Sequence, residues 1–103
     1  MQKRLVTQYT AKPEEADENQ RRIEAVFVTL SSSKPTNVSY IVLRLSDDSF
    51  VHVSFHNHGD DEPNPIADLP AFAHFQDGHE HRRQGAVDQK QATLVGAYIT
   101  EIA

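Results

Sequence analysis

The sequence of 103 residues predicts an α+β protein with the element order β-α-β-β-α-β. Apolar residues recur at helical spacing in two segments, over residues 13–31 and 69–83. β-Branched and aromatic residues gather in four further segments, which we expect to be strands. A composition of 38% hydrophobic and 24% charged residues is typical of a globular protein, and the length predicts a single domain over residues 1–103.

The first strand is expected over residues 4–10 and the first helix over 13–31. Pro13 suits a first helical turn, because the N–H that it lacks has no partner there. Acid-before-base spacing predicts the ion pairs Asp17–Arg21 and Glu18–Arg22 on the polar side of this helix. The opposite side carries apolar residues at helical intervals, namely Ala16, Ile23, Val26, Phe27 and Leu30.

The two central strands are expected over residues 37–46 and 49–56, joined as an antiparallel hairpin at Asp47-Asp48. Side chains alternate between the two faces of a strand. In the second of these strands, the apolar set is expected under the helices, and the other set is expected to line a cavity or a dimer surface. These sets are Val51, Val53 and Phe55 on the one side and Phe50, His52, Ser54 and His56 on the other.

The register of this hairpin has two possible forms. A turn of two residues would place Leu43 opposite His52, whereas a turn of three residues would place Arg44 opposite His52. A shift of one residue moves every side chain of a strand to the other face. The longer turn gathers Ile41, Leu43 and Leu45 on the apolar face, and this cleaner sorting favours it.

The second helix is expected over residues 69–83, with Asp68 as its N-cap and Gly85 ending it. Leu69, Phe72 and Phe75 form its apolar stripe, and a final strand is expected over residues 92–102. These elements complete a ferredoxin-like arrangement, in which both helices cover one face of a four-stranded antiparallel sheet. The open face would expose a large apolar patch, so we expect a homodimer.

Two segments, Ser49-Phe50-Val51-His52-Val53 and residues 69–78, resemble the antibiotic biosynthesis monooxygenase-like group of the dimeric α+β barrel superfamily. The resemblance implies two sheets packed face to face and a pocket between sheet and helices in each subunit. Some members oxidise polycyclic aromatic compounds with O₂ and no cofactor, and others degrade haem. Oxidative members usually carry a tryptophan at the end of the third strand, and this chain has none. Phe75, rather than His74, is expected at the inward position that haem-degrading members give to a histidine.

Candidate site residues lie on one face of the central hairpin. His52 and His56 are the candidate catalytic residues, because an imidazole that titrates near neutral pH can take a proton from a bound phenol or enol. Together with Tyr40, Arg44 and Ser54 they are also the candidate ligand-binding residues. The predicted function is a cofactor-independent oxygenase or proton-transfer enzyme acting on a small aromatic compound. The alternative, a non-catalytic dimeric module that binds a small molecule or serves as a scaffold, stays open.

Other classes of site and partner have little support in the sequence. His56-Asn57-His58-Gly59-Asp60-Asp61 has the form H-x-H-x-D-D but too few ligands for a catalytic metal, so no metal is expected. His79-Glu80-His81 is expected on a solvated helix face. A net charge of −5 with scattered basic pairs argues against nucleic acid. The absence of cysteine, of a signal-peptide core and of a membrane-length apolar run favours a cytoplasmic protein without a membrane partner.

Overall fold

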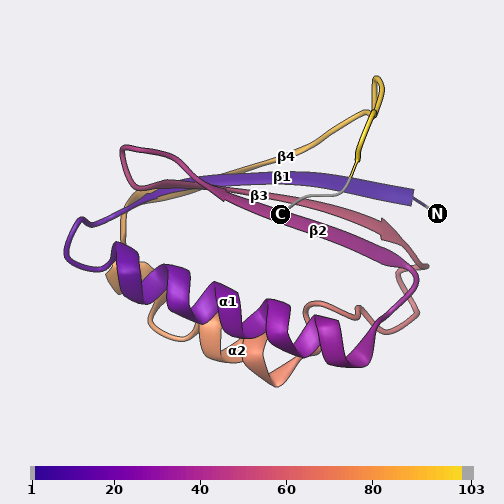
Figure 1. Cartoon of the computed structure of the whole chain (residues 1–103), viewed down its shortest axis with the longest axis horizontal. Coiled ribbons are helices and arrows are strands. Elements are labelled where there is room, and N and C mark those ends of the chain that lie inside the picture. Colours follow the sequence, from indigo (N-terminus) through magenta and orange to yellow (C-terminus); the bar gives the residue numbers. More distant parts are fainter. Residues whose placement is uncertain (1, 101–103) are drawn as a thin grey trace.

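The structure is a computed structural model and describes residues 2–100. Its strands form one sheet in the order β2-β3-β1-β4, in which all neighbours are antiparallel. The helices lie together on one side of the sheet (Figure 1), which confirms the predicted ferredoxin-like fold. The elements are β1 (Gln2–Ala11), α1 (Ala16–Ser33), β2 (Val38–Arg44), β3 (Ser49–Asn57), α2 (Pro70–Gln76), α3 (His79–Arg82) and β4 (Arg83–Gln91).

The hairpin between β2 and β3 has a three-residue turn. Leu45 donates its N–H to the carbonyl of Ser49 at 2.8 Å, and Asp48 has a positive φ of 66°. A turn that ends in a left-handed residue is common in three-residue hairpins, and aspartate tolerates that conformation better than most residues. The predicted grouping of Ile41 and Leu43 on the same face as Val51 and Val53 is therefore confirmed. The predicted pairing of Arg44 with His52 is wrong by two residues, since Val42 lies opposite His52.

The two faces of β3 are the reverse of the prediction. The helices cover the set that contains Phe50 and His52, which are 1% and 7% exposed, whereas Val51, Val53 and Phe55 lie on the open face and are only partly buried. The reason is that Phe50 stacks on Tyr9 of β1, at 5.7 Å between ring centroids, within the core under the helices. The histidines of this face are buried, and their ring nitrogens form hydrogen bonds with other side chains.

Helix α1 begins after a turn at residues 13–15 and ends at a left-handed Lys34 with a φ of 47°. Of its two predicted ion pairs, Glu18–Arg22 is present at 2.8 Å. The other is wrong, because Asp17 pairs with Arg44 of β2 at 3.0 Å. Among residues 2–100, no helix is both long enough and apolar enough to cross a membrane.

The predicted second helix is interrupted. Pro70 takes the first turn of α2 as expected, but Leu69 rather than Asp68 is the N-cap residue. The break lies at Gly78, where a φ of 71° ends one helix and starts the short α3. Glycine adopts this conformation without the steric cost that a Cβ would bring.

The fourth strand lies earlier in the chain than predicted. β4 follows α3 directly, and Gly85 has a φ of 73° within it rather than ending a helix. Residues 92–100 form neither helix nor strand and are exposed, with Val95 and Tyr98 at 99% and 94%. The predicted strand over 92–102 is therefore wrong across its described part, and residues 101 and 102 lie outside the described residues. Ala92 still donates its N–H to the carbonyl of Arg4 of β1 at 2.8 Å, and beyond it no strand pairs with this β-prone segment within residues 2–100.

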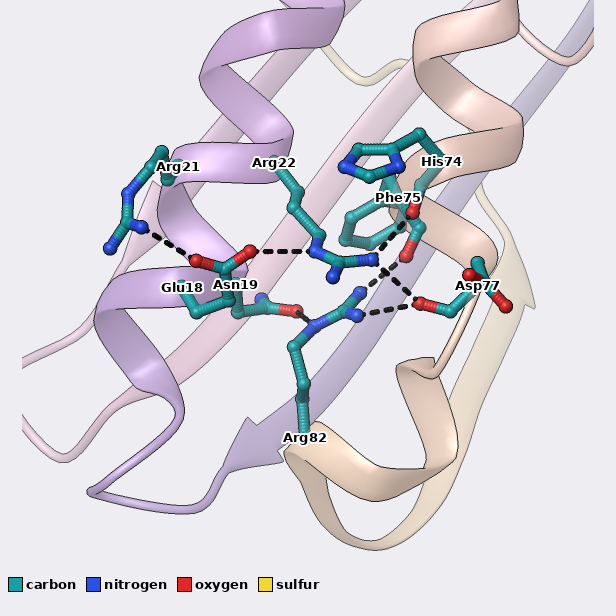
Figure 2. A network of polar contacts seen from close by, with 8 residues as sticks. All are labelled: Glu18, Asn19, Arg21, Arg22, His74, Phe75, Asp77 and Arg82. Carbon is teal, nitrogen blue, oxygen red and sulfur yellow. Dashed lines mark hydrogen bonds and ion pairs between the residues drawn. The ribbon is translucent and has the colours of Figure 1, made fainter.

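Two arginines join the three helices (Figure 2). Arg82 is only 3% exposed and donates to the side-chain oxygen of Asn19 at 3.0 Å and to the carbonyls of Phe75 and Asp77. Arg22 donates to the carbonyls of His74 and Asp77 at 2.8 and 2.9 Å. We call Arg22, Arg82 and their partners the arginine cluster. The cluster satisfies carbonyl groups at the C-terminal end of α2 that lack partners within the helix.

Candidate functional site

A cavity of about 310 Å³ lies between the helix-covered face of the sheet and the segments packed on it. Its volume is within the range of small-molecule sites. Aromatic and aliphatic side chains form much of the wall, while polar groups converge from β2, β3 and α3. The residues around it are Leu5, Thr7, Tyr9, Tyr40, His52, Ser54, His56, Asn64, Ile66, Ala67, Phe72, Phe75, Gln76, His79, Arg83, Val87 and Gln89.

The centre of the polar wall is a chain of three side chains, Tyr9, His52 and Tyr40, which we call the tyrosine–histidine chain. The Tyr9 hydroxyl lies 2.9 Å from Nε2 of His52, and the Tyr40 hydroxyl lies 2.6 Å from Nδ1 of the same ring. Each of the three residues comes from a different strand, and the register of the sheet brings them together. Both nitrogens of His52 are therefore engaged.

The tyrosine–histidine chain continues into the arginine cluster. The side-chain nitrogen of Asn19, on α1, donates to the Tyr9 hydroxyl at 2.9 Å. Asn19 is fully buried, and its oxygen accepts from Nε of Arg82 at 3.0 Å. An unbroken set of hydrogen bonds thus runs from a buried cation on α3 to the Tyr40 hydroxyl at the cavity.

Burial keeps the tyrosine–histidine chain uncharged at neutral pH. Removal from water, together with the neighbouring His79, lowers the pKa of His52 to about 4. Burial raises the pKa of Tyr9 to about 12, against the opposing effect of the hydrogen bond from Asn19. The pKa of Tyr40 is also raised by burial. A neutral imidazole between two neutral phenols can both give and accept a proton.

His79 forms a second polar group at the cavity. Its ring meets that of Tyr9 edge to face at 4.5 Å between centroids, and Phe75 lies 5.0 Å away. Its Nδ1 lies 2.8 Å from the guanidinium of Arg83, while Nε2 is buried and has no hydrogen-bond partner among residues 2–100. Burial, together with the charges of Arg83 and Arg82, lowers the pKa of His79 to about 4. A buried unpaired group of this kind is uncommon in native proteins, and a ligand can supply the missing partner.

His56 has weaker links to this network. Its Nε2 lies 3.1 Å from the Ser54 hydroxyl and its Nδ1 lies 3.1 Å from Nε2 of His58. Burial lowers the pKa of His56, and the neighbouring His58 and Lys3 add to the effect. No group of three or more potential metal-ligating side chains was found within residues 2–100.

Four of the five predicted ligand-binding residues line the cavity together, namely Tyr40, His52, Ser54 and His56. Arg44 lies apart from them, because it pairs with Asp48 at 2.7 Å and with Asp17 at the end of the sheet. The prediction that Phe75, rather than His74, points inward from the second helix is correct: Phe75 is buried and His74 is exposed.

Several residues of the site were missed in the sequence. The prediction of a solvated face is wrong for His79, which is buried: it follows Phe75 by four residues and thereby continues the apolar stripe of the helix. Tyr9 is not among the candidate residues predicted from the sequence, yet it is buried and anchors the tyrosine–histidine chain. Nothing in the sequence pointed to the pairing of Asn19 with Arg82, which are far apart along the chain.

No family model matches the sequence, and no curated protein matches it. Solved structures match over nearly the whole chain. A Bacteroides thetaiotaomicron protein with the provisional name antibiotic biosynthesis monooxygenase has a TM-score of 0.77 at 10% identity, covering 97% of this chain and 95% of its own. A Pseudomonas aeruginosa protein has a TM-score of 0.68 at 21% sequence identity, and the match covers 92% of this chain and 95% of that protein. A Mycobacterium tuberculosis protein has a TM-score of 0.72 at 9% sequence identity, and the match covers 94% of this chain and 98% of that protein. These likenesses show that the chain shares their fold.

Proposed function

We propose that the protein binds a small aromatic compound in the cavity and acts on it by proton transfer, without a bound cofactor. The observation that carries the proposal is the tyrosine–histidine chain, which ends at the cavity in the hydroxyl of Tyr40. The rings of Phe72 and Phe75 supply an apolar wall against which an aromatic ligand can stack.

A proton can pass along the tyrosine–histidine chain without movement of any heavy atom. Each hydroxyl or N–H group hands its proton to the next acceptor over 2.6–2.9 Å, which is within ordinary hydrogen-bond distance. The hydroxyl of Tyr40 can donate to the oxygen of a bound phenolate or enolate whose own proton has passed to solvent, and this hydrogen bond stabilises the electron-rich anion. Such an anion can itself give an electron to O₂. The fold shared with the Bacteroides thetaiotaomicron protein, and the name of that protein, agree with an oxygenase of this type.

The first test uses hydroxylated naphthalenes and anthracenes under air, with ligand binding and O₂ uptake measured together. For a compound that is turned over, the change His52→Gln is expected to lower kcat by roughly 10²–10⁴-fold, since this is the usual contribution of a positioned acid or base. His81→Gln, at an exposed histidine of α3, is the matched control and should leave kcat unchanged. Equal turnover by the His52→Gln variant and the unchanged protein would contradict the catalytic role.

A second candidate function is binding without catalysis. It is favoured by the low pKa of His52, about 4, because a base this weak takes a proton from a phenol only reluctantly. Both nitrogens of the ring are also already engaged. In this case an aromatic ligand would bind and be recovered unchanged, and His52→Gln would alter its affinity alone.

We also propose that the protein is a homodimer that pairs through the open face of the sheet. This face carries Ile41 and Leu43, which are 41% and 54% exposed, beside the partly buried Val51 and Val53. The exposed segment 92–100 lies on the same side of the sheet, away from the helices (Figure 1). A patch of this kind on a small protein is typical of an interaction surface.

Replacing Val53 with glutamate should place a charge in the centre of this surface and halve the molar mass measured by light scattering. The buried charge would lack a partner, which is strongly unfavourable in an interface. Val28→Glu is the matched control, because Val28 lies on α1 and is 69% exposed. A monomeric mass for the unchanged protein would refute the dimer.

A further inference from the structure

We infer that Arg82 and Arg83 hold His52 and His79 in opposite tautomers, so that two side chains of the cavity wall, Tyr40 and His79, each keep a hydrogen-bond donor without a partner and favour a ligand with an acceptor oxygen. The donors are the hydroxyl of Tyr40 and Nε2–H of His79. The ligand class, a carbonyl, enolate or phenolate oxygen on a ring compound, deepens the proposed function and rests on it. The assignment of the tautomers is independent of the proposed function.

The first step concerns the orientation of the Asn19 amide. A guanidinium group can only donate hydrogen bonds, so the Asn19 atom that lies 3.0 Å from Nε of Arg82 is the oxygen. The amide nitrogen therefore faces Tyr9, and the Tyr9 oxygen accepts a hydrogen bond from it at 2.9 Å. Arg82 thus sets the direction of the contact between Asn19 and Tyr9.

The second step concerns the hydrogen of the Tyr9 hydroxyl. Tyr9 is 4% exposed, and among residues 2–100 its hydroxyl has two partners, Asn19 and Nε2 of His52. Because Asn19 donates, Nε2 is the one acceptor left for the Tyr9 hydrogen. The opposite arrangement, in which Nε2–H donates to Tyr9, would leave a buried hydroxyl hydrogen without an acceptor.

The third step follows from the neutral state of His52. A neutral imidazole carries one hydrogen, so if Nε2 accepts from Tyr9, the hydrogen is on Nδ1. Nδ1–H then donates to the oxygen of Tyr40 at 2.6 Å. The hydrogen of the Tyr40 hydroxyl has no other partner among residues 2–100, and Tyr40 lines the cavity, so this hydrogen is available to a ligand.

The same reasoning gives the opposite tautomer for His79. The guanidinium of Arg83 donates to Nδ1 at 2.8 Å, so the hydrogen of the neutral ring is on Nε2. That Nε2–H group belongs to a side chain 9% exposed, at the wall of the cavity, and it has no acceptor among residues 2–100. Because Nε2 itself is buried, the Tyr40 hydroxyl is the donor that a ligand meets first, and an amine or ammonium group there would meet a donor in place of an acceptor.

Nitrogen NMR of the two imidazoles tests the tautomers without any ligand. In the unchanged protein the hydrogen is expected on Nδ1 of His52 and on Nε2 of His79, with the signals identified from their loss in His52→Gln and His79→Gln variants. The hydrogen found on Nε2 of His52 would overturn the inference. This spectrum needs only the folded protein, so it decides the point even if the variant described next does not fold.

The change Asn19→Asp tests the role of the arginine as a positioning residue. Aspartate has only acceptors, so it would accept from Arg82 and from the Tyr9 hydroxyl, and the Tyr9 oxygen would then accept from Nε2–H of His52. The His52 tautomer is therefore expected to reverse, while that of His79 stays the same. Gln20→Glu makes the same change of charge on the next residue of α1 and should reverse nothing. An unaltered His52 tautomer in Asn19→Asp would count against the inference.

A matched pair of probes tests the ligand class. We expect 1-tetralone, which has one carbonyl acceptor, to bind the unchanged protein roughly 5- to 10-fold more tightly than tetralin, as one net hydrogen bond implies. In Asn19→Asp this preference should shrink, because Tyr40 would now donate to His52. If neither probe binds, the ligand class and the proposed binding function both fail, while the NMR result still stands. Binding with no preference for the ketone would overturn the ligand class alone.

Discussion

Replacing Arg82 with methionine is expected to lower the free energy of unfolding by about 2–6 kcal/mol, because two buried acceptors would lose their hydrogen-bond donor. Arg82 is 3% exposed, and its side chain is the hydrogen-bond donor for Asn19 and for the carbonyl of Phe75. Methionine would fill much of the volume but would leave both acceptors buried without a partner, at about 1–3 kcal/mol each. Urea denaturation of the two proteins measures the difference.

Arg21→Ala is the control for this experiment. Arg21 lies on α1, on the far side of Glu18 from Arg22 in Figure 2, and it is 66% exposed with an ion pair to Glu18. Exposed pairs of this kind contribute about 0.2–1 kcal/mol, so the control should remain close to the unchanged protein. Similar losses in the two variants would mean that the arginine cluster does not hold the helices together in the way described.

Acidification from about pH 6.5 to about pH 4 is expected to destabilise the protein through His52, by an amount on the order of 3 kcal/mol. The pKa of this buried ring is about 4 in the folded protein against an ordinary 6.5, so across this interval the unfolded chain binds a proton that the folded chain does not. Stability therefore rises with pH through this window and is lost as the pH falls. His79 is shifted in the same direction and adds to the slope.

The contribution of His52 is isolated by comparing pH profiles of the free energy of unfolding. The His52→Gln variant should be less stable at neutral pH and should lose less stability on acidification than the unchanged protein. His81→Gln, at an exposed position, should keep the original slope. Parallel profiles for the unchanged protein and His52→Gln would show that this ring is not held neutral by burial.

The element order could be predicted from the sequence because the helix and strand periodicities are local. The errors occur where a tertiary partner decides the outcome. Residues 92–100 have a high β-propensity, but β4 forms instead from the polar stretch 83–91, which lies against the free edge of β1 and gains backbone hydrogen bonds there. The prediction for the faces of β3 is wrong for a similar reason. Val51 and Val53 are more apolar than His52 and were therefore expected under the helices, but the stacking of Phe50 on Tyr9 decides which face is covered.

The site could be predicted only in part, for a related reason. Alternation along one strand brought His52, Ser54 and His56 together, and this required no knowledge of the rest of the chain. The contact of Asn19 with Arg82 depends on how two helices pack, so no local sequence pattern predicts it. For His79 the two sequence signals conflict: its polar neighbours Glu80 and His81 favour a solvated face, whereas its spacing of four residues from Phe75 favours the buried side on which it lies.

The position of β4 at the edge of the sheet has a consequence for the timescale of access to the cavity. This strand supplies Val87 and Gln89 to the cavity wall, yet it pairs with β1 alone, is exposed along nearly all of its length and has an irregular register near Gly85. Such a segment opens at a lower free energy than the central strands. Amide hydrogens of β4 should therefore exchange with solvent sooner than those of β3, and the rate at which a ligand enters or leaves would be set by fraying of this edge.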